Sequence, residues 1–233
     1  MPLVSSLAVS SATANTASYS TAFFTPNAGM LMVGFAATSG SHTSFPLMEA
    51  TTQTWSSFHF VTSATWGTDA HSLYGFVANG LTDGNPVQVR FSCSGDNATG
   101  CIIQVLGVSS MTRFGANAVR QFAFELNQAT STTPNPLFAQ ATVSSNALLG
   151  AVALTSSPPV ITPTASWIEA FDTGYATPST GMETMYVSSG IVSTQIIWGS
   201  VCNAINCSLI VELDASEEAI QRMMGAMLQY YPR

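Results

Sequence analysis

The sequence contains no lysine and few charged residues of any kind. Of its 233 residues, five are arginine and twelve are aspartate or glutamate, so only 7% are charged and the net charge is −7. Without lysine there is no Walker A phosphate loop, no Schiff-base enzyme and no lysine acid or base. Scattered arginines on an acidic chain do not supply the clustered positive field that binds phosphates, so we expect no nucleic-acid partner.

Long apolar runs and an export signal are also missing. The longest apolar stretches, residues 30–37 and 147–154, contain glycine and fall far short of the ~20 residues that span a bilayer. The first six residues have neither the basic start nor the apolar core of a secretion signal. These features predict a soluble protein, made in the cytoplasm of its host without a signal peptide and without a membrane partner.

The composition that remains is apolar and hydroxyl-rich. Apolar residues make up 46% of the chain, enough for an ordinary core, and 30 serines and 27 threonines keep a surface wet without charge. Such a neutral surface is poor at repelling its neighbours, which favours association.

Short segments with a two-residue period, separated by turns rich in Pro, Gly and Asn, predict an all-β sandwich or barrel. The candidate strands are residues 18–25, 30–38, 72–78, 87–93, 102–108, 121–126, 137–143, 147–155, 185–188, 193–199 and 207–213.

The chain resembles itself, which predicts an internal duplication of a unit of about 110 residues. Residues 25–39 align with residues 142–156 at a constant offset of 117. Farther along, Trp55 aligns with Trp167, Tyr74 with Tyr186, and residues 101–106 with residues 207–212. Each half, about 17–118 and 119–213, either closes its own sandwich or interleaves with the other in one jelly roll. We favour one interleaved, jelly-roll-like domain, since no linker separates the halves.

Both ends of the chain differ from this pattern. Residues 1–16 are polar and low in complexity, which predicts an N-terminal arm ordered by a neighbour. Residues 214–233 are expected to form an amphipathic helix. Its apolar stripe consists of Ile220, Met223, Met224, Met227, Leu228 and Tyr231. The stripe packs either on its own sandwich or on a neighbouring subunit, and we take it as the candidate partner-binding site.

The four cysteines fall in two pairs at equivalent places in the halves. Cys93 and Cys101 bracket seven residues, and Cys202 and Cys207 bracket four. Cysteines near the ends of adjacent antiparallel strands come within reach of a disulfide, so we expect two local bridges, Cys93–Cys101 and Cys202–Cys207. Four reduced, buried thiols are the alternative, and a zinc site is a third option that the lack of C-x-x-C spacing and of a nearby histidine disfavours.

No motif for catalysis, cofactor binding or metal binding is present. His42, His59 and His71 form no metal-ligand pattern, and the run from Asp69 to Ser72 is more simply a turn entering a strand than part of a triad. Nothing in the spacing of the carboxylates singles out a glycosidase pair. Trp55 and Trp167 are expected in the core rather than as sugar platforms. We therefore expect no catalytic, cofactor-binding or metal-binding residues.

One motif set resembles a known class of proteins. The opening strand of residues 26–33, Pro-Asn-Ala-Gly-Met-Leu-Met-Val, is followed by Trp55, a strand with Tyr74 and an apolar strand ending in Gly107-Val108. This pattern, over residues 17–213, resembles β-sandwich structural proteins of tailed bacteriophages, of the decoration, head-fibre and tail-surface type, with jelly-roll or lectin-like folds. The resemblance implies a protein without catalytic residues.

The sequence thus leads to one main hypothesis and two alternatives. The first is a non-enzymatic virion structural protein, a homo-oligomer on a capsid or tail that contacts other capsid or tail proteins, with threefold symmetry by analogy. The second is a carbohydrate-binding module that attaches to host glycans. A glycan hydrolase or esterase is the third.

Overall fold

In the computed structural model, residues 1–40, 46–51, 57–66, 71–93, 96–130, 132–156 and 161–215 are described, and they form thirteen strands and one short 3-10 helix. The elements are β1 (Val4–Ala12), β2 (Ser18–Ser20), β3 (Leu31–Ser39), β4 (Pro46–Thr51), β5 (Phe58–Trp66), β6 (His71–Leu81), β7 (Gln88–Cys93), β8 (Gly100–Val108), η1 (Gly115–Ala118), β9 (Val119–Asn127), β10 (Ala147–Leu154), β11 (Ile168–Ala176), β12 (Ser179–Val187) and β13 (Asn206–Leu213).

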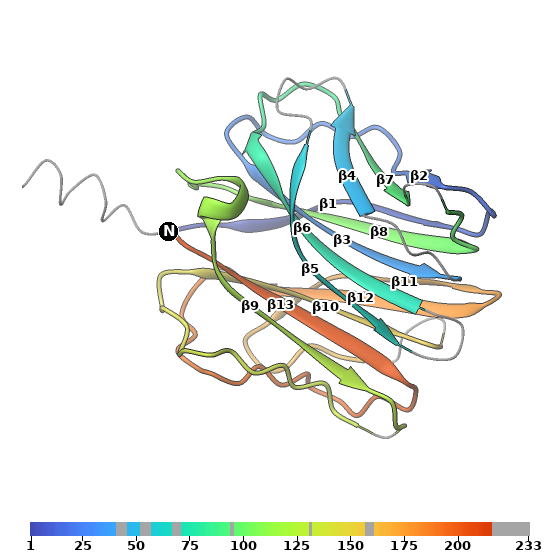
Figure 1. Cartoon of the computed structure of the whole chain (residues 1–233). Coiled ribbons are helices and arrows are strands. Elements are labelled where there is room, and N and C mark those ends of the chain that lie inside the picture. The colour runs from blue at the N-terminus through green and yellow to red at the C-terminus, as the bar shows by residue number, and fades with distance from the viewer. Residues whose placement is uncertain are drawn as a thin grey trace, which may run out of the picture.

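Ten of the strands form two five-stranded antiparallel sheets that pack face to face (Figure 1). The first sheet has the order β1-β8-β3-β6-β5, and the second has the order β11-β12-β10-β13-β9. Strand β1 lies against β11 at one side, and β5 lies against β9 at the other. The predicted all-β sandwich is therefore confirmed.

The two sheets have the same internal order. Counted from β9, the second sheet runs β9-β13-β10-β12-β11, and each strand takes the place of β1, β8, β3, β6 and β5 in turn. A duplicated unit would produce this match, although the duplication itself stays a prediction. Each sheet takes all its strands from one half of the chain. The two halves are therefore stacked on each other, and the interleaved arrangement that we favoured from the sequence is not found among the described strands.

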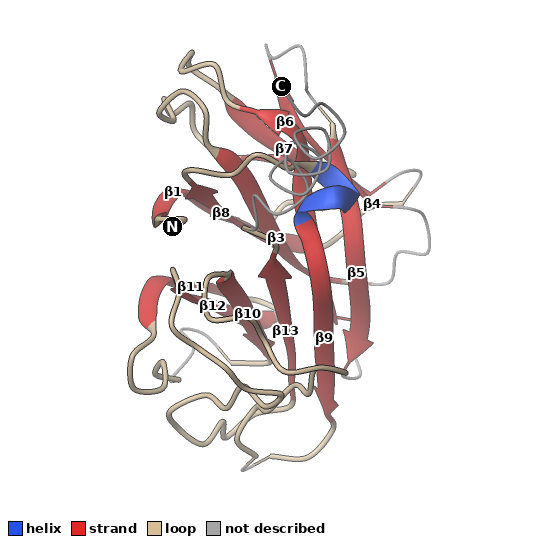
Figure 2. Ribbon diagram, turned by 90° about the vertical axis from the view of Figure 1, so that its left-hand side faces the viewer, coloured by secondary structure: helices blue, strands red, loops and turns tan. Residues whose placement is uncertain are grey.

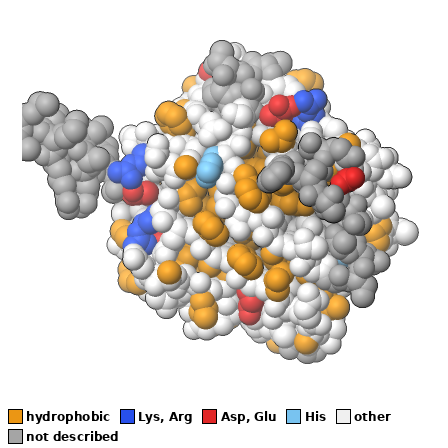
Figure 3. All heavy atoms as spheres, in the orientation of Figure 1, with side chains coloured by type: hydrophobic (Ala, Val, Ile, Leu, Met, Phe, Trp, Pro, Cys, Tyr) orange, Lys and Arg blue, Asp and Glu red, His pale blue; other side chains and the backbone are white. Residues whose placement is uncertain are grey.

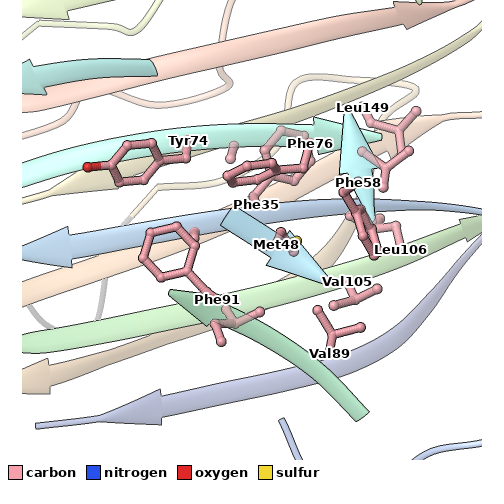
Figure 4. Packing of buried hydrophobic residues seen from close by; sticks show 14 of the residues in the cluster. Phe35, Met48, Phe58, Tyr74, Phe76, Val89, Phe91, Val105, Leu106 and Leu149 are labelled. Carbon is pink, nitrogen blue, oxygen red and sulfur yellow. The ribbon is translucent and has the colours of Figure 1, made fainter. Parts of the chain in front are cut away.

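The central strands are buried along their whole length, because layers cover both faces of each sheet. Strands β3, β8, β10 and β13 carry the near-continuous apolar runs that such burial requires. A small sheet, β2-β7-β4, covers the outer face of the first sheet, and Phe91 from it packs on Tyr74 and Phe76 (Figure 4). At Gly34 the sulfur of Met48 fills the space that a side chain would need.

The outer face of the second sheet is covered by irregular segments rather than by a sheet. These segments connect β9 to β10 and β12 to β13, and they form a second apolar cluster with Leu148, Val152 and Ile210 of the sheet. Trp167 belongs to this cluster, as its predicted core position required, and not to the layer between the sheets. Its repeat partner, Trp55, lies outside the described residues.

The N-terminal arm predicted for residues 1–16 is wrong for its greater part. Residues Val4–Ala12 are β1, which pairs antiparallel with β8 from Val4 opposite Val108 to Ala12 opposite Cys101. Two serine pairs, Ser5-Ser6 and Ser10-Ser11, make this strand hard to recognise in the sequence, but they suit it to the edge of a sheet. The predicted C-terminal helix, by contrast, falls almost wholly on residues 216–233, which lie outside the described residues.

Candidate functional site

The two predicted disulfides are not formed, and all four cysteines are free, buried thiols. Cys93 ends β7 in the small sheet and Cys101 lies in β8 of the first sheet, so they are not on adjacent strands of one sheet. Cys202 and Cys207 belong to different apolar clusters, one on each face of the second sheet. Their thiols approach backbone carbonyls instead, with Cys202 Sγ 3.3 Å from the oxygen of Ala204.

Burial makes these thiols poor nucleophiles. Desolvation raises the pKa of Cys93 to about 11, and it raises the pKa of Cys101, Cys202 and Cys207 as well. Because the thiolate is the reactive form, the cysteines serve as packing residues.

The two described histidines, His59 and His71, are separated by the fold. His71 begins β6 and is buried between the sheets, where its Nε2 lies 3.0 Å from Thr180 Oγ1 and its ring packs on Trp66. His59 is half-buried on β5. His42 and Asp69 lie outside the described residues. Within the described ranges, no three histidine, cysteine or carboxylate side chains come together as metal ligands.

A buried carboxyl group that sequence reasoning did not single out lies beneath the outer layer of the second sheet. Glu183 on β12 is fully buried, and its oxygens have no hydrogen-bond partner among the described residues. Burial, reinforced by the negative charges of Glu169 and Asp172, raises the pKa of Glu183 to about 9. The Trp198 indole N–H, as a donor near the carboxyl group, lowers this pKa but does not offset the effect of burial. The Glu183 side chain is therefore a neutral acid at neutral pH.

A second buried carboxylate, Glu212, is fully partnered. Arg120 donates a hydrogen bond to it at 2.5 Å, Gln121 donates at 2.6 Å, and Asn146 and the backbone N–H of Val143 each donate at 2.8 Å. This network ties β9 and β13 to the start of β10. Its saturated hydrogen bonding indicates a structural role.

The first candidate surface is an irregular two-stranded segment that we call the outer ribbon, residues 132–143 and 192–202. Backbone hydrogen bonds join its two halves, including Phe138 N to Thr194 O at 2.8 Å and Trp198 N to Pro134 O at 3.0 Å. One side of the ribbon faces the second sheet, and the other exposes large apolar side chains: Leu137, Val143, Val192, Ile197 and Val201. Leu137 is 63% exposed and Val192 is 67% exposed.

Next to the ribbon the surface is hollowed. Residues 164–167 and 190–197 border a depression of about 440 Å³, with the nearly buried Trp167 among its lining residues. The described tryptophans, Trp66, Trp167 and Trp198, are all buried, so they do not stand out from the surface as platforms for sugar rings.

The second candidate surface lies where β5 and β9 run side by side, and we call it the β5/β9 seam (Figure 2). A hollow of about 350 Å³ separates His59 and Val61 of β5 from Ala116 and residues 119–122. The exposed side chains of β9 at the seam are Phe122, Phe124 and Leu126, which are 41–47% exposed. In Figure 3, hydrophobic side chains gather across the face where these strands lie, and most charged ones lie towards its rim.

The apolar stripe proposed as a partner-binding site, Ile220, Met223, Met224, Met227, Leu228 and Tyr231, lies outside the described residues. In the part of the chain that is described, no helix has the length and apolar character to cross a membrane.

Comparison with known proteins yields no family. No protein-family model matches the chain, and no curated protein matches it. Among solved structures, the PBSX exported protein XepA aligns with 91% of this chain and 86% of its own, at 10% identity and a TM-score of 0.23. A similarity this weak carries no argument about fold or function.

Proposed function

We propose that the protein is a non-enzymatic structural subunit of a phage virion, a capsid-decoration or tail-surface component that acts by self-assembly. The phage setting is inferred from the resemblance of the repeated strand motif to structural proteins of tailed phages. The observation that carries the self-assembly proposal is the outer ribbon, on which five large apolar side chains face solvent.

The ribbon suits association for physical reasons. Exposed apolar side chains that lie together, rather than singly, mark contact surfaces on soluble proteins. The ribbon's own backbone is held by internal hydrogen bonds, so the surface is formed before any partner arrives. The described part of the ribbon carries no Asp, Glu, Lys or Arg, so no charge has to lose its water when two copies meet.

Native mass tests this proposal. Light scattering of the full chain over a range of concentrations is expected to give a multiple of 24.4 kDa. Leu137→Asp places a charge on the ribbon and is expected to shift the protein to the monomer. Leu47→Asp is the matched control, because Leu47 is similarly exposed (58%) but lies on the small sheet. A wild-type monomer at every concentration, or equal masses for both variants, would contradict the proposal.

A further inference from the structure

At the β5/β9 seam, apolar side chains that point into the sandwich are partly exposed to solvent. Along β9, Ala123 joins the outer cluster and Glu125 accepts a hydrogen bond from the backbone N–H of Asn135, so these side chains point outward. Side chains alternate along a strand, so Phe122, Phe124 and Leu126 point to the other face, towards the first sheet. They remain nearly half exposed because β9 is the last strand of its sheet.

The opposite side of the sandwich, between β1 and β11, is closed by polar bonds. Ser6 Oγ donates to the carbonyl of Ala170 at 3.3 Å, and Ser11 Oγ donates to the carbonyl of Gly174 at 3.1 Å. These bonds join the edge of one sheet to the edge of the other. Among the described strands the pairing at the seam is likewise within each sheet, β9 with β13 and β5 with β6, but β9 carries Phe122 and Phe124 at this edge where β1 carries serines. The seam therefore leaves a group of apolar side chains exposed that an apolar segment could bury.

The chain leaves the described structure at the upper end of this seam (Figure 2). After β13, the backbone N–H of Asp214 donates to the carbonyl of Ala118 at 2.8 Å, and the Asp214 side chain pairs with Arg113. The backbone N–H of Ala215 donates to Asn146 Oδ1 at 3.1 Å. Ala118 directly precedes β9, so the described chain ends beside the start of β9.

Residues 216–233 have enough apolar side chains and sufficient length to bury the side chains exposed at the seam. Their apolar residues recur at spacings of three and four, from Ile220 to Tyr231, as on one face of a helix. As a helix, residues 216–231 would measure roughly 24 Å, against roughly 30 Å for the nine residues of β9.

We propose that residues 216–233 of the same chain lie along the β5/β9 seam, with the Met-rich stripe against Phe122, Phe124 and Leu126. A tether fixed at Ala215 gives the segment a high effective concentration at its own seam, which favours this over the seam of a neighbour. Methionine side chains adapt to irregular apolar surfaces and pack well on aromatic rings, as this seam requires. The proposal does not depend on self-assembly through the outer ribbon.

Site-specific photo-crosslinking of the full chain tests this proposal. Benzoylphenylalanine replaces Phe124 in the seam or, as a control, Phe23, which is 63% exposed and lies next to the small sheet. Light and isotopically heavy protein are mixed before irradiation, and linked peptides are identified by mass spectrometry. Position 124 is expected to link to residues 216–233 within one chain, and position 23 is not.

Matched variants of the segment make the test specific. Met227→Ser removes one apolar side chain from the stripe and is expected to lower the yield from position 124 about tenfold. Gln229→Ser, outside the stripe, is expected to leave the yield unchanged. Links between light and heavy chains would show that the segment covers a neighbour's seam, and the proposal would be wrong. Links from position 124 only to other regions, or none at all, would equally overturn it.

Discussion

Replacing the buried Glu183 with glutamine is expected to stabilise the protein at neutral and alkaline pH. The unfolded chain releases the Glu183 proton near pH 4.5, whereas the folded chain holds it until about pH 9. Below pH 4.5 both states are protonated and folding carries no penalty. Between these values only the unfolded state is ionised, so the free energy of unfolding falls as pH rises.

The magnitude follows from the same pKa shift. Two and a half pH units separate 4.5 from 7, and each is worth about 1.4 kcal/mol, which gives an upper limit of about 3.5 kcal/mol at pH 7. Structural relaxation and water entry reduce the cost of burying a carboxyl, so we expect about 1–3 kcal/mol. Glutamine has the same shape and stays neutral. Neither Glu183 oxygen makes a hydrogen bond of good geometry to a described residue, and the glutamine oxygen can still accept from the nearby Trp198 indole, so the substitution removes no bond there.

Urea denaturation of Glu183→Gln and the wild type between pH 5 and pH 8, followed by tryptophan fluorescence, measures this difference. The gain in stability of the variant is expected to be small at pH 5 and to grow with pH. Glu49→Gln, at an exposed ion pair with Arg90 on the small sheet, is the control and is expected to change stability by less than about 1 kcal/mol. A constant difference across the pH range, or a variant less stable at pH 8, would refute the reasoning.

Three further predictions concern packing, charge and thiols. Gly34→Ala forces a methyl group against a side chain of β4 and is expected to cost about 1–3 kcal/mol in urea denaturation; an unchanged midpoint would contradict the packing described. Arg120→Met deprives the buried Glu212 of its cation and is expected to cost about 2–4 kcal/mol, whereas Arg90→Met, at an exposed ion pair, costs less than about 1. Thiol titration without reductant is expected to find four reactive cysteines after unfolding and slow reaction before it; fewer than four in the unfolded chain would indicate a disulfide.

The sequence was sufficient to predict the fold class and the central strands. Strands β3, β8, β10 and β13 are continuous apolar runs between turn residues, and burial on both faces leaves that pattern in the sequence. The serine-rich β1 was missed because an edge strand needs little apolar surface. Its serine hydroxyls donate hydrogen bonds to carbonyls of β11, more than 150 residues away in sequence, and a local sequence pattern cannot predict such a contact.

The candidate surfaces were harder to predict. Residues 137–143 and 193–199 read as core strands, but prolines at positions 134 and 136 restrict regular pairing, and half of their apolar side chains face solvent. Nothing in the sequence shows that β9 is an edge strand of its sheet, so sequence alone predicts that its phenylalanines are buried in the core. The disulfide prediction failed for a similar reason: nearness in sequence does not decide which face of a sheet a cysteine joins.

Hydrogen–deuterium exchange of the full chain at low and high concentration tests most directly whether the outer ribbon is the assembly surface. The account predicts that exchange slows with concentration at residues 132–143 and 192–202, while the small sheet β2-β7-β4 exchanges at the same rate in both samples. Protection that grows on the small sheet instead, or exchange that is independent of concentration everywhere, would contradict it.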